Sequence, residues 1–248
     1  MAPLKEQFEI SPKMKTWSMV LIAIGVIAFI LGLITKGVSN DEHQRAIFLG
    51  TLMYNSIFWM LICNGSMFFI CATTLAMGGW DAVIRRVPEA ISTLVPIFGS
   101  ITLLIFLYII FVDHNQVVYP WLNKAMVAEN HELKGKSGFL NPAFFLIWSI
   151  LAIGLWSLLG YRMRRLSSEA DEAPMDYEQG KSYIWRNTVT AGLFIVWFAL
   201  TGASTVPWFW MMSIDPLWYS TMYSWYTFAS SFVAAMSLIA LWLVYLKN

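Results

Sequence analysis

The residues best suited to chemistry in this sequence are a few ionisable side chains at the ends of long apolar segments. Asp113 and His114 directly follow one apolar run, and Asp215 stands between two others. Histidine titrates near neutral pH, so the Asp113-His114 pair would suit the acceptance of protons released when a membrane-soluble quinol is oxidised. The alternative is that a helix simply ends there in polar residues. Asp215 precedes Pro216, a pair typical of a helix start, where the carboxylate caps backbone N–H groups.

Small polar residues repeat at helical spacing in two of the apolar segments. One set is separated by four, three and four residues and comprises Ser220, Ser224, Thr227 and Ser231. The other set falls within about 60° on a helix that turns about 100° per residue, and comprises Thr51, Asn55, Ser66 and Thr73. Such stripes let membrane helices approach closely and hydrogen-bond. Alternatively, they line a hydrated half-channel with Asp215 at its mouth.

A third group of charges lies in the segment "GGWDAVIRRVPEA", which contains Arg85, Arg86 and Glu89. Arginines at such a position usually anchor the end of a helix and pair with a nearby carboxylate and with lipid phosphates. The alternative is a cytoplasmic entry point for protons at Glu89.

The sequence lacks the motifs that hold redox centres or nucleotides. His43, His114 and His131 all lie outside the middle of the apolar segments, so no histidine pair can bind a haem inside a bundle. CxxCH, HExxH, Walker and GxGxxG motifs are absent, as is the cysteine spacing of iron–sulfur clusters. We therefore expect no redox cofactor and no metal site in this chain. A net charge of +1 gives no indication of nucleic-acid binding.

The elements that must position these residues are transmembrane helices. Hydrophobic residues make up 58% of the 248 residues and charged residues only 12%, whereas a soluble domain carries about 25% charged residues. The mean hydropathy is +0.60. Backbone polar groups in a bilayer must be paired internally, and no alternation at period two suggests a β-barrel. The sequence predicts an all-α, polytopic helix bundle forming one domain over residues 1–248. Its six predicted spans are about 17–35, 47–77, 88–113, 142–161, 187–206 and 216–246.

Prolines mark several expected helix boundaries. Asn141-Pro142 and Asp215-Pro216 each combine a good N-cap residue with proline at the first helical position. Pro96 should kink the third span, and Pro207 should end the fifth. The acidic segment 168–179 is expected to be a solvated loop.

The distribution of Lys and Arg predicts the orientation. Eleven lie on the side of the N-terminus, the loops 78–87 and 162–186 and the C-terminal end, against five on the other side. The positive-inside rule then places both ends in the cytoplasm, which makes this a multi-pass protein of the cytoplasmic membrane. On the outer side we expect an aromatic belt formed by Tyr119, Trp121, Trp208, Trp210, Trp218 and Tyr219.

Four segments resemble a membrane subunit of bacterial alternative complex III. They are "GGWDAVIRRVPEA", "KSGFLNPAFFLIWSI", "YRMRRLSSEADE" and the tryptophan-rich "WFWMMSIDPLWYSTMYSWYTFASSF". The subunit is the smaller of two polysulfide-reductase-type (NrfD-like) membrane chains of that quinol:cytochrome c oxidoreductase, often called its second quinone-binding subunit. The resemblance covers about residue 50 to the end. Members of this family have a longer chain with further spans, so this chain is expected to be either shortened at its C-terminal end or a short member of the family.

The resemblance implies a non-redox subunit in the bacterial inner membrane. It would contribute scaffold, a route for protons or a contact with quinol or menaquinol. Its implied partners are the larger NrfD-like subunit, an iron–sulfur subunit and c-type cytochrome subunits, which carry the iron–sulfur clusters and haem c, together with lipids. The alternative is the quinone-binding membrane anchor of a molybdopterin-type oxidoreductase such as polysulfide reductase. A transporter without redox partners has little support, because midplane charges and internal repeats are absent.

Overall fold

A computed structural model describes residues 10–172 and 174–247 of the chain. These residues form helices and connecting turns without any strand, which confirms the all-α prediction. Within them, six helical segments are long and apolar enough to cross a membrane, as predicted. They are Pro12–Gly37, Glu42–Leu75, Arg86–Val112, Pro142–Asp171, Tyr177–Ile214 and Thr221–Leu246. Both ends lying in the cytoplasm stays a prediction.

The chain divides into two compact units, Met1–Leu49 and Gly50–Asn248. The first contains α1 (Pro12–Gly32), a π-helical turn η1 (Leu33–Gly37) and the start of α2 (Glu42–Leu75). The Ser11 side chain accepts a hydrogen bond from the Met14 N–H and caps α1. The rings of Phe29 and Phe48 lie 5.8 Å apart, so α1 and the start of α2 form a packed helical hairpin.

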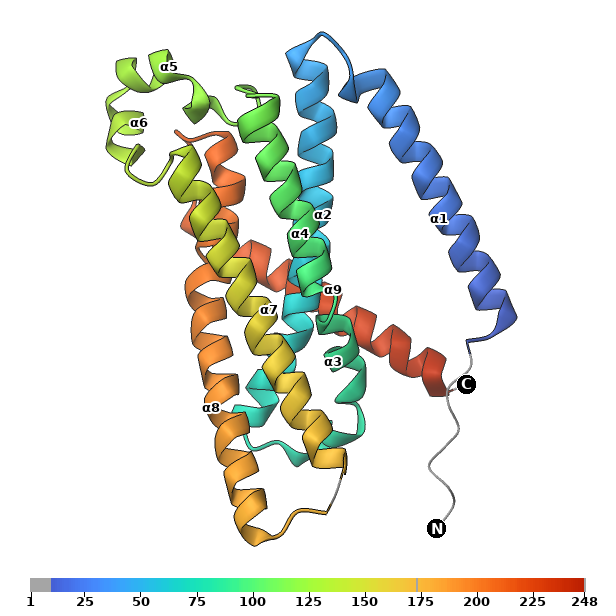
Figure 1. The fold of residues 1–248 in the computed structure, drawn as a ribbon. Helices are drawn as coiled ribbons and strands as arrows, with labels where there is room; N and C mark the ends of the chain where they lie inside the picture. The colour runs from blue at the N-terminus through green and yellow to red at the C-terminus, as the bar shows by residue number, and fades with distance from the viewer. Residues whose placement is uncertain (1–9, 173, 248) are drawn as a thin grey trace. The chain divides into compact units, whose positions relative to one another are not determined.

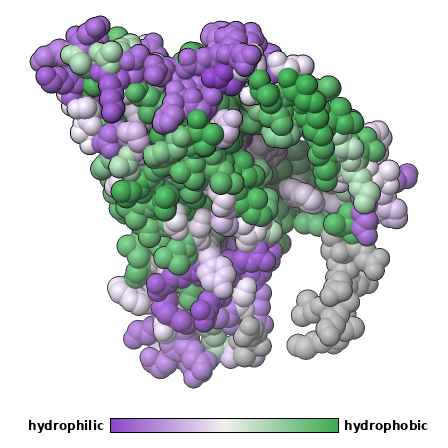
Figure 2. All heavy atoms as spheres, turned by 45° about the horizontal axis from the view of Figure 1, so that its top comes forward, coloured by the Kyte–Doolittle hydropathy of each residue, from purple (hydrophilic) through white to green (hydrophobic). Residues whose placement is uncertain are grey.

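The second unit is a bundle built from the rest of α2 and the elements that follow it (Figure 1). These elements are η2 (Gly79–Val83), α3 (Arg86–Ser92), α4 (Val95–Leu107), η3 (Tyr108–Val112), η4 (Pro120–Leu122), α5 (Lys124–Glu129), α6 (His131–Lys136), α7 (Pro142–Glu172), α8 (Tyr177–Gly202), η5 (Thr205–Met211), η6 (Met212–Ile214) and α9 (Thr221–Lys247). In Figure 2, apolar side chains cover the middle of this unit and hydrophilic ones gather at its two ends, as a bilayer requires.

Helix α4 lies antiparallel to both α2 and α7. The Thr102 hydroxyl donates to Ser56 Oγ on α2 across 3.0 Å. On the other side, the rings of Phe106 and Phe145 on α7 lie 5.1 Å apart. Helices α2 and α7 therefore run in the same direction, while α8 returns antiparallel to α7 and is tied to it by a bond from Trp197 Nε1 to the Ala152 carbonyl (3.3 Å).

Helix α9 crosses the bundle obliquely and packs closely on α2 (Figure 1). A Cβ added at Gly65 would lie 3.0 Å from the Ala235 Cβ, so the small residue permits the approach. The ring of Phe68 contacts Phe228 and Phe232 on α9 at 5.3 and 5.8 Å. Aromatic rings thus fill the space beside this approach.

Two of the predicted boundaries are confirmed. The Asn141 side chain accepts a hydrogen bond from the Phe144 N–H at 2.9 Å, and α7 begins at Pro142. Pro96 lies in the first turn of α4, after α3 has ended at Ser92, so the third span is interrupted where its ring would clash with a preceding carbonyl.

Two other predicted boundaries are wrong. Pro207 does not end the fifth span, because the chain continues as the π-helix η5, whose wider turn accommodates a residue without an N–H. Asp215 does not cap the sixth span, since α9 begins only at Thr221. Its carboxylate instead accepts a weak bond from the Leu217 N–H at 3.4 Å, within a turn.

The acidic segment 168–179 is also largely helical rather than a loop. Helix α7 extends to Glu172, and α8 begins at Tyr177. Asp176 and Gln179 form a capping box there, in which each side chain bonds the other residue's backbone N–H. The spans therefore project beyond the apolar segments that predicted them.

The α4–α7 contact allows a test of packing. A Cβ at Gly99 would lie 2.4 Å from Ile153 Cγ2, and Ile153 is a stiff, β-branched side chain. Gly99→Ala should lower stability by about 1 to 3 kcal/mol through overpacking. Gly154→Ala is the control, because a Cβ there meets no atom within 4 Å and should be neutral or slightly stabilising. Equal melting temperatures of both variants in detergent would contradict the contact.

Candidate functional site

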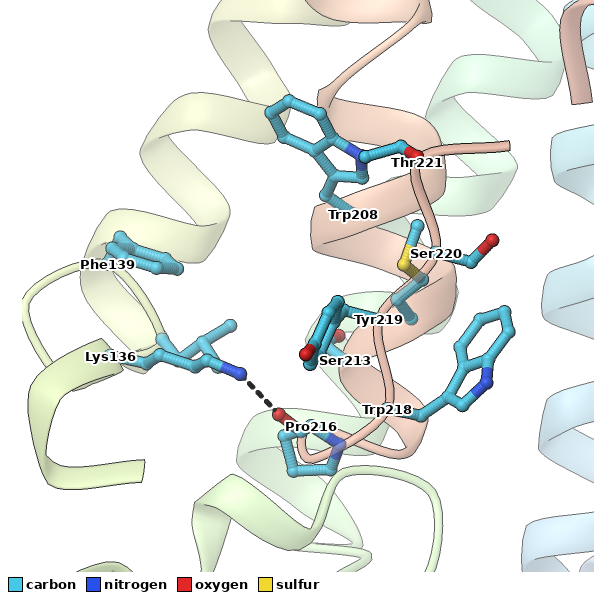
Figure 3. Close-up of a pocket in the computed structure, with 11 residues that line it drawn as sticks. Lys136, Phe139, Trp208, Ser213, Pro216, Trp218, Tyr219, Ser220 and Thr221 are labelled. Atoms are coloured by element: carbon cyan, nitrogen blue, oxygen red, sulfur yellow. Dashed lines mark hydrogen bonds between the residues drawn. The ribbon is translucent and has the colours of Figure 1, made fainter. Parts of the chain in front are cut away.

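One candidate site is an apolar pocket beside the N-terminal end of α7 (Figure 3). It encloses about 260 Å³. Its wall combines the end of α6 and the start of the α6–α7 connection with η5, η6 and the chain leading into α9. Most of the lining side chains are apolar or aromatic, and the polar ones are Lys136, Ser213, Ser220 and Thr221.

Lys136 joins the two walls of this pocket. Its ammonium donates to the Pro216 carbonyl at 2.6 Å, as the dashed line in Figure 3 shows. The two residues are 80 positions apart in the sequence. The bond therefore fixes the turn around Asp215 and Pro216 against the α6–α7 connection. Sequence patterns gave no indication of this role, because Lys136 looked like one basic loop residue among several.

The predicted proton acceptors at this end occupy different environments. Asp113 is half-buried, and its carboxylate accepts a bond from Asn115 Nδ2 at 2.7 Å. His114 is exposed and adopts φ 46°, a left-handed conformation that marks a sharp end to the third span. Asp215 is exposed as well. All three can exchange protons with water, and their role in proton transfer stays a prediction.

Half of the expected aromatic belt is instead part of the core. Trp208, Trp218 and Tyr219 are exposed, but Tyr119, Trp121 and Trp210 are at most 4% exposed. The Tyr119 hydroxyl donates to the Trp210 carbonyl at 3.1 Å, and Trp210 Nε1 donates to Ser149 Oγ at 2.8 Å. Burial raises the pKa of Tyr119. The connection between η3 and α7 therefore packs into this end of the bundle.

The two polar stripes are only partly inside the bundle. On α9, Thr227 and Ser231 are buried, whereas Ser220 and Ser224 are partly exposed. The Thr227 and Ser231 hydroxyls donate to carbonyls of their own helix, those of Tyr223 and Phe228.

On α2, Ser66 and Thr73 are buried, but Thr51 and Asn55 are exposed. The Ser66 hydroxyl donates to the Ile62 carbonyl of its own helix, at 3.1 Å. Together with the Gly65–Ala235 approach, this geometry favours the close-packing interpretation of the stripes. The half-channel stays a prediction.

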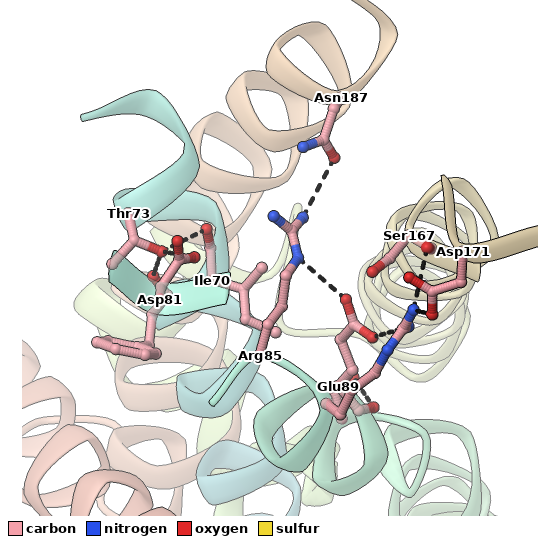
Figure 4. Close-up of polar contacts among 11 residues, drawn as sticks. Ile70, Thr73, Asp81, Arg85, Glu89, Ser167, Asp171 and Asn187 are labelled. Carbon is pink, nitrogen blue, oxygen red and sulfur yellow. Dashed lines mark hydrogen bonds and ion pairs between the residues drawn. The ribbon is translucent and has the colours of Figure 1, made fainter. Parts of the chain in front are cut away.

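At the opposite end of α7, Glu89 is clamped between two arginines (Figure 4). Glu89 is 2% exposed, and its two carboxylate oxygens accept from Arg85 Nε at 3.1 Å and Arg86 Nη1 at 2.7 Å. Arg85 also donates to Asn187 Oδ1 on α8 at 3.4 Å. Arg86 donates to the Ser167 carbonyl and pairs with Asp171, both on α7. The predicted pairing with Glu89 is confirmed, and the clamp ties α3 to α7 and α8.

A further buried carboxylate near the clamp was not predicted. Asp81 in η2 is 4% exposed, and its Oδ2 accepts from the Thr73 hydroxyl of α2 at 2.8 Å. The Gly78-Gly79 pair that precedes it, which follows Met77 at φ 53°, turns the chain back onto α2. This turn was the one signal in the sequence that Asp81 could face inward rather than water.

Among the described residues, no group of three or more His, Cys, Asp or Glu side chains is placed to hold a metal ion. No protein-family model matches the chain, and a search of curated proteins finds no similar sequence.

The clamp predicts a large effect of one neutral substitution. Glu89→Gln removes the charge that compensates two guanidinium groups, one of them largely buried, and should cost about 3 kcal/mol of stability. Glu169→Gln is the control, because its pairs with Arg165 and Arg186 are exposed and should contribute less than about 1 kcal/mol. Denaturant or SDS unfolding in mixed micelles measures both. Similar losses of stability in the two variants would contradict a larger contribution from the buried pairs of Glu89.

The buried phenol predicts a pH effect at alkaline pH. Tyr119 keeps its proton in the folded chain, whereas an unfolded tyrosine ionises at about pH 10. Its contribution to stability is therefore full below about pH 10 and decreases as the pH rises above that value. The melting temperature of wild type should fall more steeply in this range than that of Tyr119→Phe. Tyr177→Phe, at an exposed position, should behave like wild type.

Proposed function

We propose that this chain is a non-redox membrane subunit of a quinol-oxidising complex of the alternative complex III type, in the bacterial cytoplasmic membrane. One observation carries the proposal: the four segments that bear the resemblance meet in space as two pairs. The pairs lie at opposite ends of α7 and join positions more than 60 residues apart.

The first pair joins the segment 78–90 to the segment 161–172. Arg86 of the first segment donates to the Ser167 carbonyl and pairs with Asp171 of the second. Charged residues of "GGWDAVIRRVPEA" and of "YRMRRLSSEADE" thus contact each other. A similarity to the family that arose only from apolar composition would not require such contacts.

The second pair joins the segment 136–150 to the segment 208–232. It includes the bond from Lys136 to the Pro216 carbonyl and the bond from Trp210 Nε1 to Ser149 Oγ. The ring of Phe139 lies 6.4 Å from that of Phe209. These two segments line the apolar pocket, so the tryptophan-rich segment of the resemblance borders a cavity.

In this function the pocket contacts the quinol ring. Aromatic walls suit a flat apolar ring, and Lys136 with the pocket hydroxyls suits its polar oxygens. Oxidation of the quinol releases two electrons and two protons. The electrons pass to iron–sulfur and haem groups in partner chains, and the protons leave through Asp113, His114 or Asp215 to the outer water.

Purification of the tagged chain from its native membrane tests the proposed assembly. An iron–sulfur protein, c-type cytochromes that stain for haem and a larger related membrane chain should accompany it. A molybdopterin protein without c-type haem would replace the proposal by the membrane-anchor alternative. A chain that purifies alone would refute it.

Turnover of the purified complex tests the role of the pocket end. Asp215→Asn and His114→Ala should each lower quinol oxidation by at least about tenfold if these groups accept its protons. Glu132→Gln is the control, since it removes an exposed carboxylate from the connection at the same end. Full turnover and full proton release in both variants would leave the chain a scaffold without a part in proton transfer.

A further inference from the structure

Asn64 stands out among the polar residues of the core. It lies in the middle of α2 and is 0% exposed, yet neither its Nδ2 nor its Oδ1 has a hydrogen-bond partner among the described residues. The buried Ser66 and Thr73 hydroxyls of the same helix have partners, whereas the Thr74 hydroxyl also has none among the described residues. A buried amide without partners costs free energy, so native structures pair it with protein or with water.

Trp156 on α7 shows the same feature. It is 1% exposed and its Nε1 has no partner in the described chain. The indoles of Trp148, Trp197 and Trp210 all donate to an oxygen. Among the deeply buried indoles, that of Trp210 has an acceptor, whereas those of Trp156 and Trp121 have none among the described residues.

The helix register brings Asn64 and Trp156 to one level of the bundle. Helices α2 and α7 run in the same direction, and they meet where the Met67 side chain approaches Gly160. Asn64 lies three residues before Met67, and Trp156 four residues before Gly160, about one turn in each helix. The Phe198 ring of α8 closes the same region, because it contacts both Trp156 and Phe68, one turn beyond Asn64.

The Gly160 position of α7 leaves room beside the Met67 side chain. A Cβ built on Gly160 would meet only one atom within 4 Å, the Met67 Cε at 3.8 Å. Gly160 is partly exposed, and its neighbours on α7, Trp156 and Met163, are each 1% exposed. A volume close to that of a methyl group is thus open at this position, and a water molecule needs about as much.

We propose that α2, α7 and α8 hold an internal water site, in which at least one water molecule hydrogen-bonds to the Asn64 amide and the Trp156 N–H. Water both donates and accepts, so it satisfies the two donors Nδ2 and Nε1 and the acceptor Oδ1 together. An apolar occupant would leave all three unpaired. Asn64 and Trp156 are at most 1% exposed, neither lines the pocket of Figure 3, and the inference does not depend on the proposed function.

Radiolytic hydroxyl-radical footprinting of the full chain in its native membrane tests the site. X-ray pulses convert bound water to radicals, which oxidise the nearest reactive side chain even when bulk solvent cannot reach it. Met67 is 0% exposed and adjoins the site, whereas Met53 is 2% exposed and lies more than three turns away on α2. Met67 should be oxidised several-fold faster than Met53. Equal, slow oxidation of both would overturn the proposal.

Two variants identify the groups that hold the water. Asn64→Leu removes the amide, and Gly160→Ala fills the space with a methyl group that fits without a clash. Each should slow Met67 oxidation to the rate of Met53, while Gly154→Ala should leave it fast. Should Asn64→Leu fail to fold, Gly160→Ala alone decides the result. Fast oxidation of Met67 in a folded Gly160→Ala protein would also overturn the proposal.

Discussion

Polar groups inside a bilayer cannot form hydrogen bonds with bulk water, so they must find partners within the protein. Hydroxyls of the core accordingly bond back to their own helices, as those of Ser66 and Thr227 do. Indoles bond across helices, as Trp210 does to Ser149. Because each such bond fixes a rotamer or a helix pair, the requirement to satisfy polar atoms also sets the register in which the apolar surfaces pack.

The same constraint explains where the charges lie. Glu89 is almost fully buried, but it stands at the end of the bundle and is neutralised by two arginines, one of which reaches solvent. Lys136 likewise sits at the opposite end, where its ammonium bonds a carbonyl exposed by a turn. Charge therefore serves to join helix ends, and the middle of the bundle relies on neutral groups.

Hydropathy was sufficient to predict six spans, because the free energy of placing side chains in lipid depends on composition, and a spanning backbone must pair its polar groups within a helix or a closed barrel. Local rules also located the Asn141 cap. They failed at Asp215-Pro216 and Pro207, where the contacts of Lys136 and Trp210 with distant residues decide the backbone path. Spacing could place Arg85 and Arg86 near Glu89, but the partners Asp171 and Asn187 come from other helices. No pattern in the sequence distinguishes the unpaired Asn64 from an ordinary polar core residue.

The π-helical stretch Thr205–Met211 directly precedes residues that line the pocket. The orientation of those residues therefore depends on the number of residues in this stretch. A π turn contains one residue more than the α turn it replaces. Loss of a single residue there would restore α-helical geometry and rotate everything beyond it by about 100°. Trp210 would then turn away from Ser149, and Pro216 away from Lys136. Deletions in this segment should therefore be far rarer in evolution than substitutions.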